Sequence, residues 1–284
     1  AMSRAAHTVD VEIATEGHAS AAMEPHAAIA EWRDDKLTVH ASLQMPNYNI
    51  AELADSLGIE ESDIRLVSRY VGGGFGSKLG VSEETVAAAI AARELGRPVR
   101  VVMSRQQVFQ CIMRRSETTQ QLRLASDEEG KLDGFAHHAL VSNLPGEEFA
   151  EPVLQSSHFL YGGENRQLKL EVARIHRMTA GSVRAPGEAV GMPALEVAMD
   201  MLAEKSGVDP VELRRKNLIP KFEDGHDVAL GITYDSGDYL LPLDKALDHV
   251  NYRQLREEQA RLREHNQYMG IAVSCFCQIC GLGA

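Results

Sequence analysis

The chain has 284 residues and a formal net charge of -12 at pH 7, with 44% hydrophobic and 25% charged residues. This length and composition predict a folded globular protein with a substantial core, in one large or two modest domains, and exclude gross disorder. The acidic balance, without a basic cluster interleaved with aromatic residues, argues against a nucleic-acid surface. We expect no membrane segment, since no apolar run approaches the roughly 20 residues that a spanning helix needs.

In chain order, the pattern predicts a flexible lead-in over residues 1–19 and then strands mixed with helices. Asp34-Asp35 and residues 128–131 are predicted hairpin turns, and Asn49 and Ser104 are predicted helix caps. The predicted strands are residues 27–32, 37–41, 64–68, 99–103, 118–125, 134–142 and 167–175, and the predicted helices are residues 49–57, 82–96, 104–110, 191–206, 209–217 and 251–265. Long antiparallel strands mixed with helices favour an α+β fold, with mixed sheets and packed helices, over a doubly wound parallel sheet.

Residues 70–78, with the sequence Tyr-Val-Gly-Gly-Gly-Phe-Gly-Ser-Lys, form the most unusual stretch. Its glycines let the backbone adopt positive φ angles and approach a ligand closely. A glycine loop between a strand and a helix can present backbone N–H groups to an anion or a polar cofactor. The spacing matches neither common phosphate-binding motif, because position 77 is serine and Lys78 does not follow a glycine. Nucleotide binding through this loop is therefore not predicted.

A second unusual stretch spans residues 180–193, where Arg184 precedes the turn Pro186-Gly187 and a helix follows. Glu188 stands at the start of that helix, which favours compensation of the helix dipole over a role as catalytic base. Asp209 is predicted to cap the next helix, with Pro210 as its first residue.

Five segments together support a family resemblance. They are Met-Glu-Pro-His-Ala at 23–27, Gln-Met-Pro at 44–46, Gly-Gly-Gly-Phe-Gly at 72–76, Arg-Ala-Pro-Gly-Glu at 184–188 and Asp-Pro-Val-Glu-Leu-Arg-Arg-Lys-Asn at 209–217. In this order and spacing they resemble the molybdenum-cofactor-binding large subunit of the xanthine dehydrogenase and aldehyde oxidase family. The form Arg-Ala-Pro-Gly-Glu is most similar to bacterial aldehyde oxidoreductases. The resemblance implies the molybdopterin-binding α+β fold of that family.

The resemblance also implies a molybdenum–molybdopterin cofactor in a dinucleotide form. Gln44 would hydrogen-bond an oxo group of the metal or the pterin edge, and Arg184 would line the other side. No side chain of this chain is expected to ligate the metal directly. The implied cofactor-binding residues are Gln44, Gly74, Phe75, Gly76, Arg184 and Ala185.

Leu79 and Pro186 are predicted to line the substrate pocket. Purine-oxidising members of the family carry a glutamate soon after the glycine loop, where this chain has Leu79. They carry an aromatic ring at the position of Pro186. Both departures favour oxidation of a small aldehyde to a carboxylic acid, and a fragment of a purine (xanthine) dehydrogenase remains an alternative.

By the same resemblance, residues 20–219 would be the first cofactor-binding domain, and residues 220–284 a linker and the truncated start of a second one. The family's catalytic glutamate would lie in the missing C-terminal part, so the chain alone is expected to hold no catalytic residue and to be inactive. Iron–sulfur clusters and FAD are expected on an iron–sulfur subunit and a FAD subunit of the same complex. We expect a cytoplasmic location, with export to the periplasm alongside a partner left open. A non-catalytic module that folds and binds a partner is the alternative from another class.

Cysteines 275, 277 and 280 form a C-x-C-x-x-C pattern, which zinc or an iron–sulfur cluster could use. Their apolar surroundings favour instead a plain strand over residues 270–276, either disordered or paired with a neighbouring molecule.

Two pairs of polar residues complete the candidates. His137-His138 lies in a predicted strand, so the two rings face opposite sides and a structural role is favoured over metal binding. Arg114-Arg115 would either be solvated or face the anionic end of the cofactor.

Overall fold

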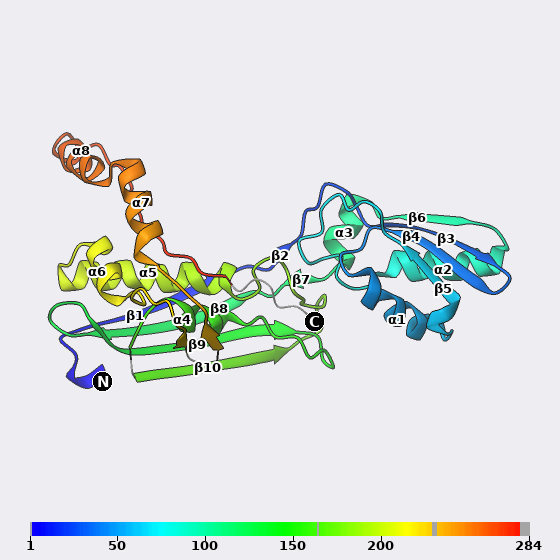
Figure 1. The fold of residues 1–284 in the computed structure, drawn as a ribbon, viewed down its shortest axis with the longest axis horizontal. Helices are drawn as coiled ribbons and strands as arrows, with labels where there is room; N and C mark the ends of the chain where they lie inside the picture. Colours follow the sequence, from blue (N-terminus) through cyan, green and yellow to red (C-terminus); the bar gives the residue numbers. More distant parts are fainter. Residues whose placement is uncertain (1, 164, 229–231, 279–284) are drawn as a thin grey trace.

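The computed structural model describes residues 2–163, 165–228 and 232–278, which form two lobes and a helical arm (Figure 1). The larger lobe contains a sheet with the strand order β1-β8-β9-β10. These strands are β1 (His7–Thr15), β8 (Thr118–Ser126), β9 (Leu132–Asn143) and β10 (Asn165–Arg174). β8 pairs antiparallel with β1 and with β9, whereas β10 pairs parallel with β9. The predicted turn at residues 128–131 is confirmed as the connection of an antiparallel hairpin.

Helix α5 (Glu188–Ser206) packs along this sheet and forms the main core with it. Met192, Leu195 and Met199 of α5 are fully buried against Leu122 and Leu124 of β8. Helix α6 (Pro210–Asn217) follows, and the predicted cap is confirmed, because the Asp209 side chain accepts hydrogen bonds from the first turn.

The flexible lead-in predicted for residues 1–19 is wrong over residues 7–15, which form β1. Val9 and Val11 are buried, whereas Asp10 and Glu12, which alternate with them, are exposed. This alternation is the period of a half-buried strand. All nine residues of β1 pair with β8, so the segment belongs to the larger sheet.

The smaller lobe is inserted between β1 and β8 in the chain. Its sheet has the order β5-β4-β3-β6, formed by β3 (Ala27–Arg33), β4 (Lys36–Ala41), β5 (Ile64–Val67) and β6 (Val99–Val102). Helices α1 (Pro46–Leu57) and α2 (Glu83–Leu95) cover one face of this sheet with a second apolar core. The predicted Asp34-Asp35 hairpin is confirmed, with φ angles of 49° and 61° at its two residues.

Helix starts depend on local chemistry in two instructive cases. Ser104 forms a capping box with Gln107 at the start of α3 (Arg105–Cys111), as predicted. Asn49 is not a cap: α1 begins at Pro46, whose ring presets the first helical φ angle. The buried Asn49 side chain instead donates to the Leu79 carbonyl at 2.8 Å.

The chain after α6 adds a short hairpin and the arm. Helices α7 (Leu240–Val250) and α8 (Tyr252–Glu264) project away from the larger lobe (Figure 1). The predicted strand over residues 270–276 is not formed; the segment runs as irregular chain, and the Cys275 N–H donates to the Glu196 carboxylate of α5 at 2.8 Å. The Cys275 N–H is thus satisfied by a carboxylate of α5 and not by a neighbouring strand. The remaining elements are η1 (Met2–Arg4), β2 (His18–Ala19), η2 (Glu61–Asp63), β7 (Arg114–Arg115), η3 (Val153–Gln155), α4 (Ser156–Phe159), β11 (His226–Val228) and β12 (Ile232–Tyr234).

None of the helices within the described residues is long and apolar enough to cross a membrane.

Candidate functional site

The glycine loop and the loop around Arg184 meet where the two lobes join. Residues 72–76 lie between β5 and α2, as predicted, and the Arg184 N–H donates to the Phe75 carbonyl at 2.9 Å. Gly76 permits this contact, since a Cβ there would lie 1.8 Å from the Ser182 carbonyl oxygen. The structure therefore brings together two loops that are far apart in the sequence.

Both loops contain a residue other than glycine in the left-handed region. The φ angle is 54° at Phe75 and 58° at Ala185. Each such conformation costs on the order of 1 kcal/mol or more, and residues of this kind cluster at ligand-binding sites. Phe75 is nevertheless 45% exposed as a residue, which leaves it available for contact.

Gln44 lies against the glycine loop. Its Oε1 atom accepts hydrogen bonds from the N–H groups of Gly76 at 3.0 Å and Lys78 at 3.3 Å. A Cβ at Gly74 would lie 2.3 Å from the same oxygen. The six predicted cofactor-binding residues are thus gathered at one place, on or against the two loops.

A charged cluster beneath the loop holds its ends. The Oε2 atom of Glu24 accepts hydrogen bonds from the Gly72 N–H at 2.8 Å, from Lys78 Nζ at 2.7 Å and from Ser42 Oγ at 2.5 Å. Burial raises the pKa of Glu24, but the hydrogen bonds from Lys78, Ser42 and Gly72 and the charge of Lys78 outweigh this effect and lower the pKa to about 2. The Lys78 side chain is fully buried. The role of Lys78 was not predicted, although its place directly after the glycine loop was the available signal.

Arg115 braces the second loop. Its guanidinium is 3% exposed and donates to Glu151 Oε1 at 2.5 Å and to the Val183 and Ala185 carbonyls at 3.1 Å each. It also donates to the Arg184 carbonyl, and Glu151 Oε1 accepts the Gly187 N–H at 2.6 Å. Burial raises the pKa of Glu151, while the Gly187 N–H and Arg115 oppose that rise.

Of the two alternatives for the arginine pair, solvation is therefore wrong. Arg115 is committed to the loop, and Arg114, also buried, donates to Ser142 Oγ at 3.0 Å and pairs with Glu117. Strand β7 places the two arginine side chains in the interior. They can be buried there because loop carbonyls and carboxylates accept their hydrogen bonds.

Comparisons with known proteins identify the family. The family model described as the molybdopterin cofactor-binding domain matches residues 1–218. The chain belongs to this family. The aldehyde oxidoreductase molybdenum-binding subunit PaoC of Escherichia coli (strain K12) is 41% identical over 217 residues, which cover 76% of this chain and 30% of that subunit. The nicotine 6-hydroxylase large subunit of Paenarthrobacter nicotinovorans is 29% identical over 99% of this chain and 35% of its own length. The chain thus spans about a third of these relatives.

Solved structures agree with this assignment. Quinoline 2-oxidoreductase from Pseudomonas putida 86 superposes with a TM-score of 0.87 at 25% identity, over 96% of this chain and 36% of that one. Aldehyde oxidoreductase from Desulfovibrio gigas superposes with a TM-score of 0.81 at 27% identity, over 91% of this chain and 28% of that one. The predicted α+β fold and the resemblance to the large subunits of the xanthine dehydrogenase and aldehyde oxidase family are confirmed.

The loop chemistry fits a molybdopterin cofactor. Within the described residues, the N–H groups of Gly73, Gly74 and Phe75 and the guanidinium of the exposed Arg184 have no hydrogen-bond acceptor. Free donors on two loops that meet suit a polar, anionic group.

Of the two predicted pocket residues, one follows the glycine loop and the other lies in the second loop. Leu79 is half-buried, and its N–H donates to the Gly76 carbonyl at 3.2 Å. Pro186 is half-buried in the second loop, before Gly187, where a Cβ would lie 2.2 Å from the Pro152 carbonyl oxygen. Glu188 lies buried in the first turn of α5, at the position predicted for it.

The histidine pair has the predicted arrangement. His137 is buried between Ser157 and Gln120, and burial, aided by the charges of His138 and His158, lowers its pKa to about 4. His138 lies on the opposite, solvent side beside Glu171. Within the described residues no group of three or more His, Cys, Asp or Glu side chains could hold a metal ion, and Cys280 lies outside those residues.

Proposed function

We propose that this molybdopterin-binding chain is the cofactor-binding part of a molybdenum hydroxylase that oxidises aldehydes to carboxylic acids. The observation that supports the proposal is the meeting of the two loops: the Arg184 N–H donates to the Phe75 carbonyl, and Gln44 accepts the Gly76 N–H from the glycine loop. The cofactor, in a dinucleotide form, would supply the redox chemistry of the oxidation when bound. The protein's own contribution is to bind and orient it.

Each residue has a distinct part in that binding. The Gly73, Gly74 and Phe75 amides would donate to oxygen atoms of the cofactor, and the Arg184 guanidinium would offer a charge to its anionic portion. The Phe75 ring forms an apolar wall that limits access of water. Arg115 and Lys78 would not contact the cofactor. They hold the two loops in place, Arg115 through the Arg184 carbonyl and Lys78 through Glu24.

Leu79 and Pro186 support the choice of substrate. Neither side chain can donate or accept a hydrogen bond, so a purine, which carries several polar edges, would leave those edges unsatisfied there. Similarity to named aldehyde oxidoreductases points the same way: the Escherichia coli K12 subunit is 41% identical, whereas the xanthine dehydrogenase molybdenum-binding subunit of Escherichia coli O157:H7 is 27% identical.

The chain would act within a larger assembly. Its relatives include a subunit of the 6-hydroxypseudooxynicotine dehydrogenase complex, and we propose an iron–sulfur subunit and a FAD subunit as partners. The 284-residue chain alone should not turn over aldehydes, because the proposed partners would supply the route by which electrons leave. We place the assembly in the cytoplasm, a reducing compartment that suits Cys111, Cys275 and Cys277, which are free thiols in the part of the chain that the structure describes.

The deciding experiment measures molybdenum content and activity in the assembly that contains this chain. Arg184→Ala should lower molybdenum occupancy, since loss of one charge-assisted hydrogen bond costs about 1.5–3 kcal/mol, roughly tenfold to a hundredfold in affinity. Arg263→Ala, at an exposed site on α8, is the matched control and should leave occupancy unchanged.

Benzaldehyde and xanthine, each offered with an artificial electron acceptor, then test the substrate. Turnover of the aldehyde over the purine is expected. An assembly that folds normally but contains no molybdenum would favour the alternative of a non-catalytic module. A preference for xanthine would instead assign the chain to a purine dehydrogenase.

A further inference from the structure

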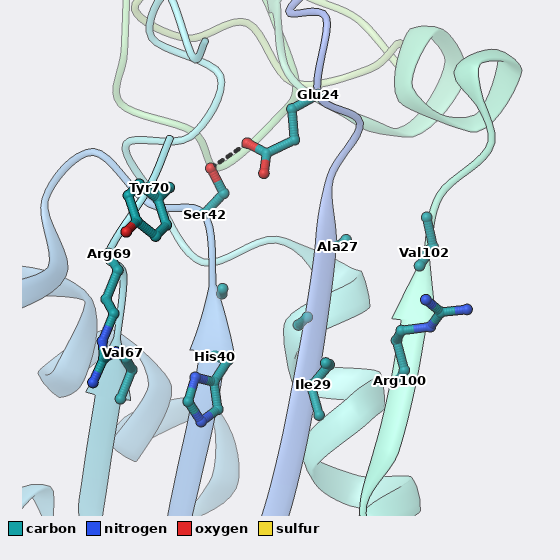
Figure 2. Close-up of a pocket in the computed structure, with 12 residues that line it drawn as sticks. Glu24, Ala27, Ile29, His40, Ser42, Val67, Arg69, Tyr70, Arg100 and Val102 are labelled. Carbon is teal, nitrogen blue, oxygen red and sulfur yellow. Dashed lines mark hydrogen bonds between the residues drawn. The ribbon is translucent and has the colours of Figure 1, made fainter. Parts of the chain in front are cut away.

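The sheet of the smaller lobe has one covered face and one open face. Ala28, Ala30, Leu37 and Val39 point towards α1 and α2 and are buried in the core beneath those helices. The opposite face of the same strands carries a hollow of about 400 Å³ (Figure 2). Figure 2 shows the side chains that line this hollow, and two of them, on β3 and β6, remain exposed in the described chain.

The middle of the open face is apolar. Strand pairing places Ile29 of β3 directly opposite His40 of β4 and Arg100 of β6. The next position on the same face pairs Ala27 with Val102. Ile29 is 42% exposed and Val102 is 49% exposed. The solvent face of an antiparallel sheet is usually polar, so exposed apolar side chains at diagonal positions on neighbouring strands favour a contact surface.

The border of this face is basic, although the whole chain has a net charge of -12. Arg69 and Arg100 line the hollow, and Arg65 lies two positions before Val67 on the same face of β5. Within the described residues none of these three arginines forms an ion pair. Among the described residues that line the hollow, only Glu24 is acidic, and it forms an ion pair with Lys78.

We propose that this open face, centred on Ile29 and Val102 and bordered by Arg65, Arg69 and Arg100, docks a partner protein through an acidic surface with an apolar centre. The apolar strip would be buried by the partner's apolar side chains, and the unpaired guanidinium groups would meet its carboxylates. A nucleic acid would supply phosphates but no apolar centre for the strip, and it would be repelled by the acidic remainder of the chain.

The position of the hollow gives the docking a structural consequence. One end of it is formed by Glu24, Ser42 and Tyr70, and Figure 2 shows the hydrogen bond between the first two. The same Glu24 carboxylate holds the Gly72 N–H at the start of the glycine loop. The partner would therefore sit against the base of that loop. The proposal does not depend on the identity of the cofactor or substrate.

The test places the photo-cross-linking residue p-benzoylphenylalanine at Val102 in the chain, which is tagged and purified with its native assembly. The matched control carries the same residue at Ile90, which is 50% exposed on α2, the helix on the covered side. Mass spectrometry of the cross-linked peptides identifies what contacts each position. The expected product at Val102 is a protein segment with Asp or Glu residues around apolar ones.

Charge reversal then tests the basic border. The double variant Arg69→Glu/Arg100→Glu should lower the Val102 cross-link yield by about tenfold or more, because like charges would face each other across the contact. The double variant Arg4→Glu/Arg263→Glu changes the net charge equally at exposed sites elsewhere and should preserve the yield. Both variants are checked for unchanged far-UV circular dichroism.

Four outcomes would overturn the proposal. They are equal cross-linking at Val102 and Ile90, a nuclease-sensitive product, a product formed with a second copy of this chain, and a protein product whose yield is unaffected by reversal of Arg69 and Arg100.

Discussion

Replacement of Gly76 by alanine tests whether the two loops meet as the structure shows. The glycine has a φ angle of 99°, and an added Cβ would lie 1.8 Å from the Ser182 carbonyl oxygen. The unfavourable φ costs about 1–2 kcal/mol for a residue with a Cβ, and forcing an atom into a packed contact adds about 1–3 kcal/mol. Gly76→Ala should therefore destabilise the junction by about 2–5 kcal/mol.

Gly146 provides a matched control. Its φ angle is 92°, close to that of Gly76, but no atom lies within 4 Å of the position that a Cβ would occupy. Gly146→Ala should therefore carry the conformational cost alone, about 1–2 kcal/mol. The difference between the two variants isolates the contact between the loops.

Urea unfolding of both variants gives the overall loss of stability, and amide hydrogen exchange at Arg184 gives the local one. The Arg184 N–H donates across the junction to the Phe75 carbonyl, so its protection should fall in Gly76→Ala and persist in Gly146→Ala. Equal destabilisation by the two substitutions, with Arg184 protection retained in both, would show that the loops do not touch at this point.

Three further variants test the supports of the site and of the fold. Arg115→Ala should cost about 3–5 kcal/mol of stability in urea unfolding, because it leaves Glu151 buried and unpaired. Arg123→Ala, which removes a partner from an exposed ion pair, should cost less than about 1 kcal/mol. Similar losses in the two variants would contradict the role of Arg115 in holding the second loop. Glu24→Gln should remove a contribution to the free energy of unfolding that is present above the ordinary pKa of 4.5 and is lost as the pH falls towards about 2. Because the Glu24 side chain is 38% exposed, screening limits this contribution to about 1–2 kcal/mol. If the acid dependence of unfolding is the same in the variant across this range, the role given to Glu24 is wrong. Asp209→Ala should cost about 1 kcal/mol in thermal unfolding through loss of the α6 cap, and a neutral effect would mean that the cap is dispensable.

The loops were predictable because their signals are local. Consecutive glycines before a capped helix, and a Pro-Gly turn before another, mark changes of backbone direction wherever the chain folds. The same holds for Ser104 and Asp209, whose side chains bond backbone groups within their own first turns. The prediction of Asn49 as a cap was wrong because α1 already begins at Pro46, and a proline at the first helical position is a stronger start signal.

By itself, then, the sequence determined the order and type of most strands and helices, the two loops and the family, because these depend on periodicity, turn chemistry and motif spacing over short stretches. Only the tertiary structure decided that β1 joins β8 around an inserted lobe and that Phe75 meets Arg184. It also decided that buried charged side chains hold the two loops: Lys78 bonds Glu24, 54 positions away in the sequence, and Arg115 bonds the Arg184 carbonyl, 69 positions away. A lysine or arginine looks solvated in a linear pattern, and it becomes a buried brace only where folding brings carboxylates and carbonyls around it to offset its desolvation.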